Sequence, residues 1–145
     1  MLEIFDGSLD TCALYERWER MASERNFGAV VIFVGIVRDE AEISALSFDI
    51  YEPLLRAWFE GWQERAKAQG ALICMAHSRG DVRNHTSSFA CAILSPKRRV
   101  ALEMSDIFVE DFKRNAPIWK YDVRNGERIY ARARSQKIDG SGILA

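Results

Sequence analysis

The spacing of hydrophobic residues along the chain predicts three amphipathic helices. In each of them apolar side chains recur every three or four residues, so that one face of the helix can pack against a core. Pro53 and Pro96 suit the first turns of the second and third helices, and Pro117 bars the third from continuing. The predicted helices are residues 10–25, 53–69 and 96–115.

Strand patterns fill the intervals between these helices. Residues 29–37, with the sequence AVVIFVGIV, form a nearly continuous β-branched run that is typical of a strand buried on both faces. Residues 46–51 alternate apolar and polar side chains, as a half-buried strand does. Asn125 and Gly126 are the strongest short signal for a two-residue hairpin turn. The other predicted strands are residues 2–5, 71–77, 87–94, 118–124 and 127–133, with a loop at 78–86.

The order of these elements, β-α-β-β-α-β-β-α-β-β, predicts an α+β fold. Consecutive strands are joined by links too short for a parallel crossover, so we expect a mainly antiparallel sheet with packed helices and a C-terminal β-hairpin. No internal repeat or linker divides the chain. We therefore expect one domain over residues 1–134, followed by a mobile C-terminal tail at 135–145.

Composition narrows the class of protein. Hydrophobic residues make up 48% of the 145 residues and charged residues 28%, a balance typical of a globular domain. No apolar stretch is long enough for a membrane span, and the N-terminus lacks a signal-peptide pattern. Three cysteines without a CxxC pair suit a reducing cytoplasm, and a net charge of -1 argues against nonspecific nucleic-acid binding. We expect a cytoplasmic protein that binds neither membranes nor nucleic acid.

Cations gather where predicted elements begin or end. These residues are Arg38, Lys97, Arg98, Lys113 and Lys120. Functional side chains often lie at such positions, and the start of the third helix offers unpaired N–H groups that favour an anion. The same cations could instead be solvated edge charges or partners of a helix dipole. Spacing alone leaves both interpretations open.

Other residues that could carry chemistry point to no metal or cofactor. Neither His77 nor His85 lies with cysteine or carboxylate at metal-ligand spacing, so we expect no bound metal. We also expect no cofactor. Cys74 and Cys91 fall in apolar strand patterns, where a buried and inert thiol is the expected state.

The segments that carry these residues resemble the large-subunit family of molybdopterin synthase, in the same order along nearly the whole chain. The most specific is Asp111-Phe112-Lys113, followed by Ala116-Pro117-Ile118-Trp119-Lys120. The others are residues 28–39, which include FVGIVR, residues 50–51, Met75-Ala76-His77 with Gly80, and Ser95-Pro96-Lys97-Arg98. The resemblance implies an α/β-hammerhead-like domain.

The resemblance also implies a reaction and partners. Sulfur carried as a thiocarboxylate on the C-terminal glycine of a small ubiquitin-like subunit is added twice to cyclic pyranopterin monophosphate, which yields the dithiolene of molybdopterin. Two large subunits form a central homodimer, and each binds one small subunit to give a heterotetramer.

Roles for individual residues follow from the same resemblance. Lys113 corresponds to the principal catalytic lysine and Lys120 to a second essential lysine. Arg38 and Arg98 correspond to pocket residues, and Arg98 could act in the site of the neighbouring protomer. Lys97 is expected to bind an anion, while Phe33 is either part of the pocket wall or an ordinary core side chain. We expect crowding by neighbouring cations to favour the neutral form of Lys113.

The chain departs from the family pattern in three places. His77-Ser78-Arg79-Gly80 carries its arginine one position late, Lys97 stands where the family has histidine, and the link after Arg38 is short. Two other functions therefore stay open: a noncatalytic module that binds the tail of a ubiquitin-like partner, and an enzyme acting on another phosphorylated heterocycle. A further hypothesis is that residues 140–145 cover the partner's channel when the partner is absent.

Overall fold

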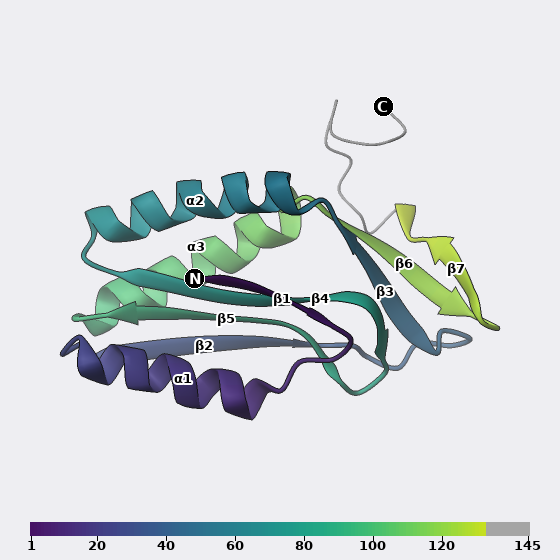
Figure 1. Ribbon diagram of the computed structural model, residues 1–145, viewed down its shortest axis with the longest axis horizontal. Helices are drawn as coiled ribbons and strands as arrows, with labels where there is room; N and C mark the ends of the chain where they lie inside the picture. Colours follow the sequence, from purple (N-terminus) through teal and green to yellow (C-terminus); the bar gives the residue numbers. More distant parts are fainter. Residues whose placement is uncertain (133–145) are drawn as a thin grey trace.

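The protein is described by a computed structural model that places residues 1–132 (Figure 1). Its elements follow the predicted order. They are β1 (Leu2–Asp6), α1 (Thr11–Glu24), β2 (Ala29–Ile36), β3 (Ala45–Ile50), α2 (Glu52–Ala68), β4 (Leu72–Arg83), β5 (Ser87–Ser95), α3 (Arg98–Asn115), β6 (Ile118–Arg124) and β7 (Glu127–Tyr130).

The strands form one seven-stranded sheet in the order β2-β5-β4-β3-β6-β7, with β1 paired to β4. Only the β1–β4 pair is parallel among the described strands. Asn125 and Gly126 both have positive φ, 49° and 78°, as the tight turn between β6 and β7 requires. The predicted α+β class and the mainly antiparallel sheet are confirmed.

Strand β4 belongs to both halves of this sheet. Its first part pairs with β5 as far as His77, and its last part pairs with β3 from Gly80 onward. Gly80 adopts a φ of 76°, which a residue with a side chain rarely takes, and the strand changes partner at this point. In Figure 1, β3 and β6 consequently run obliquely to β2 and β5.

Helices cover both faces of the first half of the sheet (Figure 1). The α1 side chains Leu14, Trp18 and Ala22 pack on one face, against alternate residues of β4 and β5. Helices α2 and α3 pack on the other face, against Ile73, Met75, Phe89, Cys91 and Ile93. Because both faces are covered, β5 is buried along almost its whole length.

Two predicted element boundaries need correction, and three further predictions concern residues beyond those that the structure describes. The loop expected at 78–86 is mostly strand, because β4 continues to Arg83 by pairing with β3. The last strand ends at Tyr130 rather than at residue 133. The domain boundary at 134, the tail at 135–145 and the hypothesis about residues 140–145 fall outside the described residues.

No helix within residues 1–132 combines the length and the apolar character that crossing a lipid bilayer demands.

We expect Gly28→Ala to destabilise the fold, because a Cβ at this position would lie 2.9 Å from the carbonyl oxygen of Pro96. Backbone would have to shift where β2 begins and α3 is about to start, at a cost of about 1–3 kcal/mol. Gly61→Ala is the matched control, since its Cβ would meet nothing within 4 Å in the exposed face of α2 and should stabilise by about 0.5–1 kcal/mol. Chemical denaturation of both variants checks this, and equal effects would contradict it.

Candidate functional site

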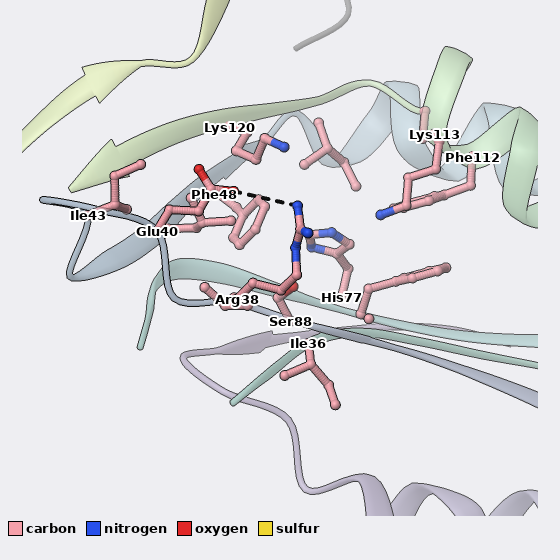
Figure 2. A pocket seen from close by; sticks show the side chains of 16 residues that line it. Ile36, Arg38, Glu40, Ile43, Phe48, His77, Ser88, Phe112, Lys113 and Lys120 are labelled. Atoms are coloured by element: carbon pink, nitrogen blue, oxygen red, sulfur yellow. Dashed lines mark ion pairs between the residues drawn. The ribbon is translucent and has the colours of Figure 1, made fainter. Parts of the chain in front are cut away.

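A pocket of about 290 Å³ opens where the two halves of the sheet diverge (Figure 2). Its walls come from the end of β2, from β3, β4, β5 and β6, and from the last turn of α3. Segments that are far apart in the sequence therefore meet at one place.

Three of the predicted site residues line this pocket. They are Arg38, which follows β2, Lys113 in the last turn of α3, and Lys120 in β6. Figure 2 shows their nitrogen atoms directed into the same space. Arg38 is largely solvated, with 85% of its side chain exposed, and it forms a 3.7 Å ion pair with Glu40 at the rim. The pocket thus combines cationic side chains with a rim carboxylate.

An aromatic pair forms one wall of the pocket. The rings of Phe89 and Phe112 stack with centroids 3.9 Å apart and an interplanar angle of 1°. The ammonium of Lys113 lies over both rings, 5.8 Å from the Phe89 centroid and 5.5 Å from that of Phe112. A cation over aromatic faces is attracted by the ring quadrupole. This contact holds the end of the lysine at the pocket wall.

The environment of Lys113 favours its neutral form. Although much of the side chain is exposed, desolvation of the ammonium lowers the pKa of Lys113 below the ordinary 10.5, and Cys91 opposes this to a smaller extent. The direction agrees with the expectation from the sequence. The expected cause, crowding by neighbouring cations, is wrong, because desolvation is the main cause. The neutral amine of Lys113 is therefore easier to reach than that of an ordinary surface lysine.

Asp111 fixes the turn of α3 that carries Lys113. Its Oδ2 accepts hydrogen bonds from the indole N–H groups of Trp58, at 3.0 Å, and Trp62, at 2.7 Å, both on α2. Its Oδ1 accepts from Asn115 at 2.6 Å. Burial alone would raise the pKa of the Asp111 carboxyl, but these hydrogen bonds outweigh it and hold the pKa below the ordinary value. The two tryptophans thus pack in or against the core and also donate the hydrogen bonds that hold Asp111.

The other predicted site residues lie away from the pocket of this chain. Lys97 and Arg98 are exposed at the start of α3, and a rise of about 1.5 Å per residue puts Arg98 roughly 22 Å from Lys113 along that helix. Phe33 lies in β2 behind the pocket wall, with its ring centroid 5.9 Å from that of Phe89. One protomer therefore does not bring these three residues to the pocket.

His77 lines the pocket but was not among the predicted site residues. The residues of β4 alternate between faces, so Ile73, Met75 and His77 share the side that α2 and α3 cover. The period-two pattern up to residue 77 could have identified it. Arg79, by contrast, forms a 3.1 Å ion pair with Asp6.

The buried thiols have the character expected from the sequence. Burial raises the pKa of Cys74 to about 11 and that of Cys91 to about 12, so both stay protonated near neutral pH. Neither residue lines the pocket. Within residues 1–132, no group of three or more histidine, cysteine or carboxylate side chains is placed to hold a metal ion.

Replacing Asp111 by alanine should destabilise the protein by about 2–4 kcal/mol, because two indole N–H groups would lose their acceptor. The pKa of the Asp111 carboxyl is lower in the folded protein than in the unfolded chain. Its contribution to the free energy of unfolding is therefore fully present above the ordinary pKa and is lost as the pH falls through the pKa of the folded protein. Urea unfolding at several pH values measures this. Glu110→Ala removes an exposed carboxylate from the same turn and should change stability by less than about 0.5 kcal/mol.

Comparisons with known proteins place the chain in a family. The model of the MoaE protein family matches residues 8–115. The molybdopterin synthase catalytic subunit of Helicobacter pylori strain 26695 is 52% identical over 145 residues, which cover all of both chains. The corresponding subunit of strain J99 is 47% identical over the same length.

Solved structures also share the fold of this chain. A complex of subunits 1 and 2 of molybdopterin-converting factor from Helicobacter pylori 26695 contains a chain that superposes with a TM-score of 0.93, at 52% identity over 99% of each chain. Molybdopterin synthase from Staphylococcus aureus, at 22% identity, a TM-score of 0.75 and coverage of 88% of this chain and 94% of its own, shares the fold. A family model that spans most of the sequence and a relative alike over its full length establish that the chain belongs to the MoaE protein family.

Proposed function

We propose that the chain is the catalytic subunit of a molybdopterin synthase, an enzyme of molybdenum cofactor biosynthesis. It transfers sulfur from the thiocarboxylated C-terminus of a small ubiquitin-like subunit to cyclic pyranopterin monophosphate. The observation that carries the proposal is the pocket in which Lys113, Lys120 and Arg38 meet beside stacked aromatic rings, in a chain alike over its full length to catalytic subunits.

The pocket chemistry fits both reactants. The substrate carries a phosphate and the partner's terminus carries a thiocarboxylate, so both are anions that lysine and arginine side chains attract. A flat heterocycle also finds aromatic and aliphatic surface in the pocket, including Phe48, Phe89 and Phe112. Cations and apolar walls together suit a substrate that is part anion and part ring system.

Lys113 is the pocket residue that we propose to act as proton shuttle or nucleophile. Sulfur transfer requires protons to move as the carbon–sulfur bond forms and as the partner's acyl group leaves. A neutral lysine amine can exchange those protons, or it can attack the carbonyl carbon of the thiocarboxylate. Either role needs the amine without its extra proton, and the lowered pKa of Lys113 makes that form more accessible.

Membership of the family supports a proposal about the assembly. The Helicobacter pylori relative forms a complex of subunits 1 and 2, and we propose the same pairing here, with the partner's extended C-terminal tail entering the pocket. We further propose a homodimer at the centre of a heterotetramer. A second copy would account for Lys97 and Arg98, which lie at the far end of α3 from the pocket of their own chain. The cytoplasm remains the predicted compartment.

Replacement of Lys113 by alanine should lower the rate of dithiolene formation at least about 100-fold while leaving affinity for the small subunit unchanged. The assay combines the protein, its thiocarboxylated partner and cyclic pyranopterin monophosphate, and titration calorimetry measures partner binding. Lys67→Ala is the matched control, because Lys67 also lies in the last turn of a helix but does not line the pocket. Full activity of Lys113→Ala would refute the role of the lysine. Partner binding by the unsubstituted protein without any product would favour a noncatalytic module.

Mixing two inactive variants tests whether Arg98 serves the neighbouring protomer. We expect Lys113→Ala and Arg98→Ala each to be impaired alone, and an equimolar mixture refolded together to recover activity. Each heterodimer would contain one site with both native residues, so about a quarter of all sites would be restored. Absence of recovery, with mixed dimers verified by mass spectrometry, would show that Arg98 does not act across the interface.

A further inference from the structure

His77 is the most buried polar side chain of the pocket. Its exposed fraction is 3%, and its imidazole lies among three phenylalanine rings. The ring of Phe48 meets it edge-on with centroids 5.0 Å apart, and the centroids of Phe112 and Phe89 lie at 5.7 and 5.9 Å. Figure 2 shows the imidazole directed from β4 toward the space that Arg38 and Lys113 also enter.

The surroundings of His77 fix its tautomer. Its Nδ1 lies 2.7 Å from the backbone carbonyl oxygen of Ser78, which can only accept, so Nδ1 carries a hydrogen and donates it. Burial lowers the pKa of His77 to about 4, although the Ser78 carbonyl opposes this, and the nearby charge of Lys113 lowers it further. The ring is therefore neutral near pH 7, and Nε2 is left with a lone pair.

This lone pair complements the other polar groups of the pocket. Arg38, Lys113 and Lys120 can only donate hydrogen bonds when they are charged, and Ser88 can both donate and accept. The carboxylate of Glu40 accepts, but it lies at the rim with 42% of its side chain exposed and is paired with Arg38. Nε2 of His77 is thus a buried pocket atom that can accept but not donate, whereas the hydroxyl of Ser88 can do either.

We propose that His77 is a substrate-recognition residue, whose Nε2 accepts a hydrogen bond from a ring N–H or amino group of the bound heterocycle. Cations alone would hold any phosphate of suitable size, whereas a buried acceptor discriminates in favour of a ring system that carries a donor. The inference rests on the proposed function, because it takes the pyranopterin, whose ring bears N–H groups, as the ligand.

The test observes His77 directly. The sequence contains two histidines, so protein labelled with ¹⁵N-histidine gives two sets of ring signals, and the exposed His85 outside the pocket is an internal control. Multiple-bond ¹H–¹⁵N spectra should show His77 as the neutral tautomer with hydrogen on Nδ1. Saturating cyclic pyranopterin monophosphate should shift the Nε2 resonance toward the value of a hydrogen-bonded nitrogen and leave His85 unchanged, whereas inorganic phosphate should shift neither.

Binding measurements with variants provide a second test. His77→Phe keeps an aromatic ring in the cluster but removes the acceptor, and it should raise the substrate dissociation constant about tenfold. His77→Gln, whose side-chain oxygen accepts, should stay within about threefold of the unsubstituted protein. Circular dichroism establishes that both variants are folded, and affinity for the small subunit should not change.

The outcomes separate this inference from the proposed function. Substrate binding with an unmoved Nε2 signal, or equal affinity in His77→Phe, would overturn the role of His77 and leave the enzyme assignment standing. Failure of the unsubstituted protein to bind cyclic pyranopterin monophosphate would overturn both.

Discussion

The pocket depends on the way in which the last turn of α3 is fixed to the rest of the molecule. Phe112 stacks on Phe89 of β5, and its neighbour Asp111 accepts hydrogen bonds from two indole groups of α2. The contacts lie on two sides of the turn, so the backbone can neither rotate about the helix axis nor lift from the sheet without losing one of them. Lys113 is the next residue in the chain, so the position of its Cα is fixed by the same contacts. A flexible side chain on a rigid base is restricted to a small volume at the pocket wall, which is the preorganisation that a catalytic group needs.

The second requirement is the change of partner along β4. Because this strand pairs first with β5 and then with β3, the two halves of the sheet diverge, and a space remains between them that α3 only partly closes. Arg38 enters this space from the end of β2 and Lys120 enters it from β6, so the cations come from opposite halves. A flat sheet would have set these strands side by side and left no cavity. Gly80, with its positive φ, lies where β4 begins to pair with β3, although the residue itself does not line the pocket.

Local patterns in the sequence were sufficient for most of the fold. The three helices and the order of all ten elements follow from periodicity and from proline and glycine positions. The extent of β4 did not follow, since residues 78–83 look like a loop until β3 provides hydrogen-bond partners. Arg38, Lys113 and Lys120 were grouped by resemblance, because no local pattern reports that three distant elements meet. The separation of Arg98 from Lys113 could have been predicted from the rise of an α-helix, since fifteen residues of one helix span too great a distance for a single small pocket. The tautomer of His77 could not be predicted from the sequence, because it depends on the position of the Ser78 carbonyl in the folded chain.

The cations of the pocket differ in how readily they can change partner. Arg38 forms a surface ion pair with Glu40, and such pairs contribute about 0–1 kcal/mol, so an arriving anion can displace Glu40 from the guanidinium at little cost. Lys113 has no comparable freedom, because the aromatic rings and the fixed turn of α3 limit where its amine can go. This difference suits a division of tasks in which a mobile arginine captures a charged group at the mouth and a positioned lysine acts further in. It also explains why Glu40 is compatible with an anion site: a rim carboxylate weakens the field only locally, and it keeps Arg38 near the mouth until a stronger partner arrives.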